Sequence, residues 1–190
     1  LIAQGGGPTN VINQSLVGII KQEKKFKSNI YGAINGVNGI INNRFISLNK
    51  ISERDLNLIS QTPGAALGST RDKPDQKYCL EILNILKKKK INKFYYIGGN
   101  DSSDSLRIIS EYTKKIDNNI FVAGCYNGSG IGVGTLFGEQ IAIMASNQQS
   151  DEIDIINKRT KPNRLPPNPI LNLGIQARLF YERIRASSDV

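Results

Sequence analysis

The sequence contains no histidine and no tryptophan, and its 190 residues include only two cysteines. Without histidine, the commonest general base and the commonest metal ligand are both absent. Cys79 and Cys125 stand far apart and form no CxxC pair, so they indicate reduced thiols of a cytoplasmic protein rather than a disulfide framework or a zinc site. No apolar run reaches the roughly 18 residues that a membrane-spanning helix needs, and the first residues lack the features of a signal peptide. We therefore expect no association with a membrane.

Negative charge is also scarce, and the formal net charge is +9. Such an excess suits nucleic acids or small anionic substrates as partners. The one dense basic run, Lys87 to Lys90, stands at the end of a predicted helix, where cations stabilise the helix dipole. No aromatic–basic RNA-binding motif, zinc finger or basic zipper is visible. We therefore expect small anions, and no nucleic acid, to be the partners.

The most informative stretch is Phe94 to Ser105, FYYIGGNDSSDS. Its aromatic and β-branched run stops at Gly98 and Gly99, and apolar residues recur at helical spacing from Leu106. The pattern predicts a strand, a glycine turn and a helix start whose free N–H groups can bind a phosphate. Because the carboxylate of Asp101 would repel a phosphate, a cation must lie between them, and Mg²⁺ is the usual choice. A plain turn capped by Asp or Ser is the alternative interpretation.

Two further glycine-rich loops have the same character. Gln4 to Thr9 precedes an amphipathic helix that Asn10 is predicted to cap. Thr62 to Arg71, TPGAALGSTR, ends in an arginine whose planar fork matches two phosphate oxygens. Neither loop has the spacing of a Walker A loop or of a dinucleotide fingerprint. Each loop alone is also compatible with an ordinary connection.

The order of the predicted elements indicates an α/β protein. Strands are expected at 1–3, 29–33, 45–48, 94–97 and 119–123, and helices after Asn10, from Ser52, over 75–91, from Leu106 and in the stretch after Gly132. Gly32, Gly36 and Gly39 predict a loop between the second and third strands. Strands that alternate with helices predict a parallel sheet covered on both faces, with ligands at the carboxyl ends of its strands. The three glycine loops would then lie along one edge.

Four stretches resemble, in order, the N-terminal motifs of the 6-phosphofructokinases: LIAQGGGPTNVIN, IYGAINGVNGI, TPGAALGSTR and YYIGGNDSSDS. The GGND in the last motif is typical of the diphosphate-dependent branch, whereas ATP-dependent relatives carry GGDG. The resemblance implies a Rossmann-like phosphofructokinase fold, a mainly parallel sheet with helices on both faces. It also implies a glycolytic transferase that moves a phosphoryl group from diphosphate to O1 of fructose 6-phosphate. Its partners would be these two substrates and further chains in a homo- or hetero-oligomer.

The resemblance further implies roles for matching residues. The phosphoryl donor would be bound by Gly6, Gly7, Arg71, Gly98, Gly99, Asn100 and Ser102. Asn100 and Asp101 would hold Mg²⁺, and Asp101 would be catalytic. The Asp101 side chain would also fill space that ATP needs, which favours the smaller diphosphate. Arg178, in LNLGIQAR, would bind the sugar phosphate.

The match weakens after Ala123, where the strand continues into GCYNGSGIG. The family's Pro-Lys-Thr-Ile-Asp-Asn-Asp segment, whose first Asp is the general base, is not found there, and neither is its Met-Gly-Arg motif. Either central segments are missing from this sequence or the protein has lost them. We expect a donor-binding α/β domain over residues 1–124 and a partial sugar-phosphate region over 125–190. The alternatives are a catalytically silent phosphofructokinase-like subunit, a phosphate-binding regulatory chain and another GGD-type kinase, although the GGGPT and LGSTR loops weigh against the last.

Overall fold

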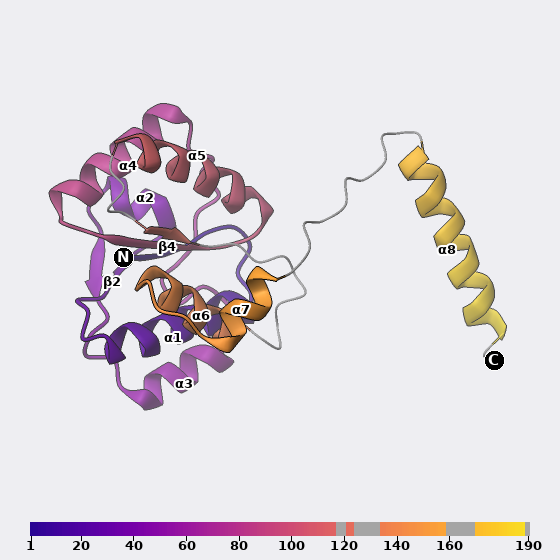
Figure 1. Cartoon of the computed structure of the whole chain (residues 1–190), viewed down its shortest axis with the longest axis horizontal. Coiled ribbons are helices and arrows are strands. Elements are labelled where there is room, and N and C mark those ends of the chain that lie inside the picture. The colour runs from indigo at the N-terminus through magenta and orange to yellow at the C-terminus, as the bar shows by residue number, and fades with distance from the viewer. Residues whose placement is uncertain (117–120, 124–133, 159–169, 189–190) are drawn as a thin grey trace. The chain divides into compact units, whose positions relative to one another are not determined.

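The computed structural model describes residues 1–116, 121–123, 134–158 and 170–188. Its elements are β1 (Ile2–Gln4), α1 (Asn10–Lys25), β2 (Tyr31–Ala33), α2 (Gly36–Ile41), β3 (Phe45–Ser47), α3 (Glu53–Gln61), α4 (Gln76–Lys88), β4 (Lys93–Ile97), α5 (Asn100–Ile116), β5 (Phe121–Ala123), α6 (Gly134–Ala145), α7 (Asp151–Asn157) and α8 (Ile170–Ser188). They fall into two compact units, Leu1–Asp154 and Ile155–Val190. The first unit contains the sheet (Figure 1).

The sheet has five strands in the order β3-β2-β1-β4-β5. β1 pairs in parallel with both β2 and β4, so that Ile2 lies opposite Gly32 on one side and Tyr95 on the other. β5 is also parallel to β4, whereas β3 runs antiparallel to β2. The mainly parallel α/β sheet expected from the sequence is therefore confirmed, with one antiparallel strand at its edge.

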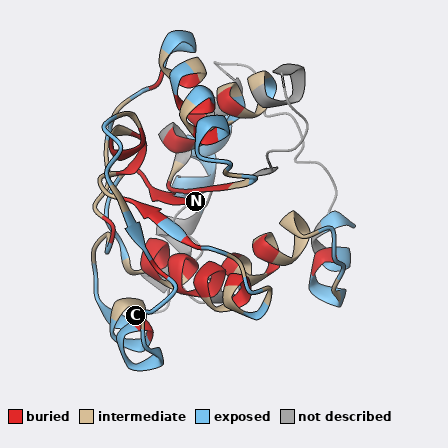
Figure 2. Cartoon of the chain, turned by 90° about the vertical axis from the view of Figure 1, so that its left-hand side faces the viewer, coloured by how far each residue is buried: buried red, intermediate tan, exposed pale blue. Residues whose placement is uncertain are grey.

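The alternating side chains of β4 divide the core into two parts. Phe94 and Tyr96 pack with buried residues of α2, α4 and α5, whereas Tyr95 and Ile97 pack with buried residues of α1, α3 and α6. Successive residues of a strand point to opposite faces of a sheet, so a strand that is apolar throughout must be covered on both sides. Helices α2, α4 and α5 accordingly cover one face of the sheet and α1, α3 and α6 the other (Figure 1), and buried residues lie where these helices meet the sheet (Figure 2).

Side-chain caps account for two of the helix starts. The backbone N–H of Asp55 donates to Ser52 Oγ at 3.1 Å, so the cap predicted for α3 is confirmed. Asp75 caps α4 by accepting a 2.8 Å hydrogen bond from the N–H of Tyr78. Asn10 does not cap α1 as predicted, because the helix already begins there and Thr9 occupies the cap position.

Two helices differ from the sequence-based expectation. The segment predicted as a loop around Gly36 and Gly39 contains α2, which follows Asn35 in the left-handed region with a φ of 62°. Asparagine tolerates this conformation, and Gly39 lets α2 turn tightly against the backbone of Ile34. α5 begins at Asn100, directly after the glycine turn, rather than near Leu106.

The first compact unit runs to Asp154 and includes α6. α6 packs along α1, and an added Cβ on Gly138 would overlap the carbonyl oxygen of Ser15, so the two helix backbones touch. Residues up to Asp154 therefore belong to the same compact unit as the sheet. In the second unit, α8 exposes large apolar side chains such as Leu173 and Phe180. No helix within the described ranges is both long and apolar enough to span a bilayer.

Candidate functional site

The strand order places a crevice between the ends of β1 and β4. From β1 the chain leads through α1 to its neighbour β2 on one side, and it later returns through α4 to β4 on the other side. Ligands of open α/β sheets bind at such a reversal, outside the carboxyl ends of the strands. β1 ends at Gln4 and β4 ends at Ile97, so the loops beginning with Gly5 and Gly98 meet here.

A cavity of about 300 Å³ lies at this position. Its lining comes from three separate segments and consists of Gly6, Gly7, Thr70, Arg71, Asp72, Tyr96 and Ser102. Backbone hydrogen bonds join these segments, because Gly5 N–H donates to the Ile97 carbonyl at 2.8 Å and Gly6 N–H donates to the Thr70 carbonyl at 3.0 Å. The three glycine loops predicted to share one edge thus surround one cavity.

Two glycines are required by the geometry of the cavity. Gly6 has a φ of +73°, in the left-handed region that other residues rarely adopt. A Cβ on Gly98 would overlap the side chain of Ser102 and lie 2.9 Å from the carbonyl oxygen of Gly5. Only glycine at position 98 therefore allows β4, the first loop and the start of α5 to approach one another so closely.

The start of α5 supplies the third wall of the cavity. Ser102 stands in the first turn of α5 and is buried against Gly6. The first N–H groups of a helix have no partner within the helix and carry partial positive charge, so they attract anions. Asn100 and Asp101 are the first two residues of α5, and the backbone therefore places them at this end of the helix.

Arg71 and Asp72 close the cavity from the opposite loop. Arg71 is exposed, so its guanidinium can meet a ligand from solvent. The Asp72 carboxylate is held by the hydroxyl of Tyr78 at 2.9 Å and by the side-chain amide of Asn38 at 3.2 Å. Asn38 is in turn contacted by Arg44, whose guanidinium donates to Asn38 Oδ1 at 2.5 Å. Helices α2 and α4 therefore hold the residue that follows Arg71.

The hydrogen bonds to Asp72 keep it ionised. Partial burial acts to raise the pKa of this carboxyl, but hydrogen bonds from Thr70, Tyr78 and Asn38 outweigh burial, and the pKa is lowered below its ordinary value of 3.8. Burial, followed by the neighbouring Asp72 carboxylate, raises the pKa of the Tyr78 phenol. The phenol therefore remains a donor to Asp72 throughout the neutral range.

The donors at the cavity can be compared with the needs of Mg²⁺. This ion usually binds through one or two carboxylates together with substrate phosphate oxygens rather than in a cage made only of protein ligands. Asp72 supplies a carboxylate to the cavity wall, and Asp101 belongs to the helix turn beside it. The described part of the chain contains no cluster of three or more acidic, cysteine or histidine side chains that could hold a metal alone. The site therefore suits a magnesium ion that arrives with a phosphorylated ligand.

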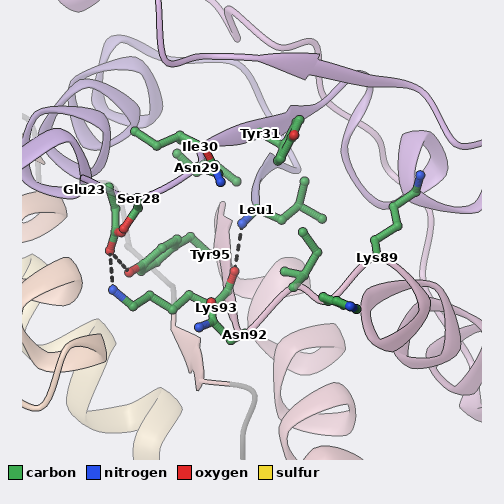
Figure 3. A pocket seen from close by; sticks show the side chains of 13 residues that line it. Leu1, Glu23, Ser28, Asn29, Ile30, Tyr31, Lys89, Asn92, Lys93 and Tyr95 are labelled. Atoms are coloured by element: carbon green, nitrogen blue, oxygen red, sulfur yellow. Dashed lines mark hydrogen bonds and ion pairs between the residues drawn. The ribbon is translucent and has the colours of Figure 1, made fainter. Parts of the chain in front are cut away.

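A second cavity, of about 410 Å³, lies at the opposite ends of the strands (Figure 3). Its wall contains the buried carboxylate of Glu23, which accepts hydrogen bonds from Tyr95 at 2.7 Å and from Lys93 at 2.9 Å. Lys93 also donates to Ser146 just after α6. These contacts pair and hydrogen-bond a charge buried inside the fold, as such a charge requires.

The structure brings most of the predicted donor-site residues to one place. Gly6, Gly7, Arg71 and Ser102 line the first cavity, with Gly98 and Gly99 at its edge and Asn100 and Asp101 in the adjoining helix turn. Arg178 lies on α8, in the second compact unit, where its guanidinium stands 5.7 Å from the centre of the Tyr181 ring. Residues 124–133, where the family's general base was sought, lie outside the described residues.

Sequence reasoning missed three lining residues, Thr70, Asp72 and Tyr96. Thr70 and Asp72 flank the predicted Arg71, so their position beside a candidate ligand residue was an available signal. Tyr96 lies within an apolar strand and gave no such signal. The alternation of side chains along a strand does not show which of its two faces borders the cavity.

Several known proteins have sequences or structures similar to that of this chain. Residues 1–146 match the model of the protein family described as "Phosphofructokinase". A pyrophosphate–fructose 6-phosphate 1-phosphotransferase from Rhodospirillum rubrum is 51% identical over 119 residues, which cover 62% of this chain and 30% of that protein. The enzyme of the same name from Xanthomonas campestris is 34% identical over 119 residues, covering 60% of this chain and 28% of that protein.

A solved structure of a similar enzyme has a similar fold. The pyrophosphate-dependent phosphofructokinase from Nitrosospira multiformis superimposes with a TM-score of 0.60 and 29% identity, covering 65% of this chain and 32% of that chain. The present chain thus spans about a third of the length of the relatives that it matches. Since the family match includes the sheet, all three cavity segments and α6, this chain belongs to the phosphofructokinase family.

Proposed function

We propose that this chain forms the phosphoryl-donor site of a diphosphate-dependent phosphofructokinase. The reaction transfers one phosphoryl group from diphosphate to O1 of fructose 6-phosphate and yields fructose 1,6-bisphosphate and phosphate. The observation that carries this proposal is the cavity at the ends of β1 and β4, where two glycine loops, Arg71 and the N-terminus of α5 meet. Its donors are of the kinds that bind phosphate.

Each donor-side residue has a role that follows from its place. The backbones of Gly6, Gly7, Gly98 and Gly99 allow phosphate oxygens to approach closely, and Ser102 offers a hydroxyl in the first turn of α5. Arg71 pairs with the oxygens of the leaving phosphate and stabilises the charge that gathers on them.

Asn100 and Asp101 would hold Mg²⁺ at the start of α5, and Asp101 would serve catalysis by fixing the donor there. When bound, Mg²⁺ supplies positive charge that neutralises the phosphate oxygens during transfer. Arg178 of α8 is proposed to bind the phosphate of the sugar, in keeping with its LNLGIQAR motif. We propose that the donor side lies within residues 1–124 and the sugar-phosphate side within residues 125–190.

The surroundings in which this enzyme works form part of the proposal. We infer a cytoplasmic, glycolytic enzyme that assembles as a homo- or hetero-oligomer. The reduced-thiol pattern of Cys79 and Cys125 supports the compartment, and the names of the similar enzymes support the pathway step. Cys79 is fully buried, and burial, with a further contribution from Asp75, raises the pKa of its thiol to about 11.

Calorimetric titration tests the donor site directly. We expect this chain to bind magnesium diphosphate and the Arg71→Ala variant to bind it at least about tenfold more weakly, since a bidentate charged contact is lost. Arg54→Ala, which removes an exposed arginine of α3, is the matched control and should bind like the wild type. Equal affinities of the wild type and Arg71→Ala would contradict the proposed site.

Donor choice can be tested at Asp101. If its side chain occupies space that a nucleotide needs, diphosphate should bind in preference to ATP, each in the presence of Mg²⁺. Asp101→Gly should weaken the binding of diphosphate. A clear preference of the wild type for ATP would refute this part of the proposal.

A non-catalytic phosphofructokinase-like subunit is the second candidate, because the sequence after Ala123 lacks the family's base segment. A positioned base typically contributes about 10²–10⁴ in rate. We therefore expect this chain to bind magnesium diphosphate but to form fructose 1,6-bisphosphate far more slowly than the 1–100 per second, roughly, of typical kinases. Turnover within that range would show that another residue supplies the base.

A further inference from the structure

Two side-chain amides lie buried beneath the donor cavity. Gln4, the last residue of β1, and Asn13, in the first turns of α1, are 0% and 1% exposed. They contact each other, since Gln4 Nε2 donates to Asn13 Oδ1 at 3.1 Å. A buried polar group is destabilising unless it is hydrogen-bonded, so such a pair at this position requires partners.

The partners belong to the loop that carries Arg71. The N–H of Leu67 donates to Gln4 Oε1 at 2.9 Å, and the N–H of Ala66 donates to Asn13 Oδ1 at 2.8 Å. Asn13 Nδ2 donates to the Thr62 carbonyl at 2.8 Å, which secures the beginning of the same loop. Three loop residues are therefore held by two side chains from the other wall of the cavity.

The pair also connects the loop to α1. The second N–H of the Gln4 amide donates to the Ile12 carbonyl at 3.0 Å. Both oxygens thus face backbone N–H groups, and both NH₂ groups face carbonyl or amide oxygens. The Gln4 carboxamide uses one acceptor oxygen and two N–H donors here, whereas an ionised carboxylate has no donor and an apolar side chain has neither donor nor acceptor.

We propose that Gln4 and Asn13 are positioning residues that hold the loop of residues 62–71 so that Arg71 faces Gly6 and Gly7 across the cavity. The proposal rests on the proposed function for its ligand, but the structural restraint can be measured without one. From Leu67 the loop runs to Thr70, whose carbonyl accepts the N–H of Gly6 at 3.0 Å. Release of residues 62–67 would therefore loosen the contact on which the position of Arg71 depends.

The test uses Gln4→Met, which keeps the length and lack of charge of the side chain but removes its hydrogen bonds. We expect magnesium diphosphate to bind on the order of tenfold more weakly, since the lost bonds act on the placement of Arg71. We also expect faster hydrogen exchange at the amides of Ala66 and Leu67. Gln22→Met is the matched control, because Gln22 is a buried glutamine at the far end of α1, where its side chain accepts a bond only from nearby Lys25 among the contacts described.

Gln4→Glu supplies a readout that a merely structural role would not change. Burial raises the pKa of a carboxyl, so a glutamate here is protonated in mildly acidic solution and regains one donor. Relative to the wild type at the same pH, the affinity of Gln4→Glu for magnesium diphosphate should recover between about pH 8 and pH 5.5. Gln4→Met should show no such recovery.

The outcomes separate the two proposals. If the wild type fails to bind magnesium diphosphate, the proposed function fails, and exchange confined to residues 62–71 in Gln4→Met still supports the restraint. The inference would be overturned if Gln4→Met bound magnesium diphosphate and exchanged its amide hydrogens like the wild type. It would also be overturned if hydrogen exchange became faster evenly over the whole sheet. If Gln4→Met does not fold, Asn13→Ala carries the same exchange measurement, because it removes the partners of Ala66 and Thr62 while leaving the bond between Gln4 and Leu67.

Discussion

The backbone N–H of Gly6 donates a 3.0 Å hydrogen bond to the carbonyl oxygen of Thr70. The two residues are 64 positions apart, and this bond joins the glycine loop after β1 to the residue directly before Arg71. The walls of the candidate donor cavity are thereby linked by their backbones. Changes on either wall should consequently affect the other.

The conformation of Gly6 gives a first prediction. Gly6→Ala should lower the free energy of unfolding by about 1–2 kcal/mol, because an L-residue is strained at a φ of +73°. An added Cβ there would make only ordinary contacts, the nearest at 3.6 Å, so the strain of the backbone should account for the loss. Gly7→Ala is the control, since a Cβ at Gly7 meets nothing within 4 Å. Urea denaturation compares the two variants, and equal stabilities would contradict the prediction.

The lowered pKa of Asp72 predicts a pH dependence of stability. Because its folded pKa lies below the ordinary 3.8, the native state binds fewer protons than the unfolded state just below that pH. The stability that ionised Asp72 contributes is therefore complete above its pKa in the unfolded chain and is lost as the pH falls through its pKa in the folded protein. Denaturation midpoints measured across this acidic range should fall less steeply in Asp72→Asn than in the wild type.

Tyr78→Phe provides the accompanying comparison for Asp72. It removes the 2.9 Å bond to the carboxylate but leaves the bonds from Asn38 and Thr70. We expect its acidic slope to lie between those of the wild type and Asp72→Asn. Three identical slopes would show that these bonds do not set the pKa of Asp72.

The buried carboxylate of Glu23 gives a prediction about stability at the opposite edge of the sheet. Glu23→Ala should lower the free energy of unfolding by about 3 kcal/mol, because it leaves Tyr95 and Lys93 without their shared acceptor. Tyr95→Phe removes one of the two bonds and should lower it by about 1–2 kcal/mol. Chemical denaturation at neutral pH measures both values. A larger loss in Tyr95→Phe than in Glu23→Ala would exclude Glu23 as the centre of the cluster.

The contact between α1 and α6 gives the last prediction. Gly138→Ala should lower the thermal midpoint, since its methyl group would overlap the Ser15 carbonyl and force the helices apart at a cost of about 1–3 kcal/mol. Gly174→Ala in α8 is the matched helical control, because a Cβ there meets nothing within 4 Å and alanine favours helix by about 1 kcal/mol. A wild-type midpoint in Gly138→Ala would show that α6 does not depend on this close approach.

The local pattern of the sequence was sufficient to predict most of the elements of the sheet. The apolar runs ending in glycine at Gly5 and Gly98 predicted strands followed by helices, because periodicity and turn residues act over a few positions. The resemblance to the phosphofructokinases then implied a common phosphate site for Gly6, Gly7, Arg71 and Ser102. Parallel strands have their carboxyl ends at the same edge of a sheet. The pattern of strands was therefore enough, without side-chain detail, to predict that these loops lie close together.

Contacts between distant segments could not be predicted in this way. α2 forms in a glycine-rich stretch that reads as a loop, and α6 joins the first unit through the close approach of Gly138 to Ser15. Neither feature leaves a periodic signal, because each depends on the shape of a surface built by other parts of the chain.

The sequence by itself therefore determined the α/β pattern, the family motifs and the residue types available to a phosphate. Only the tertiary structure decided that Asp72 is held by α2 and α4, and that Gln4 and Asn13 lie beneath the Arg71 loop. The bond from Leu67 to Gln4 spans 63 positions. A hydrogen bond of that separation depends on how the strands and helices pack, and no local pattern of residues encodes which polar groups will meet.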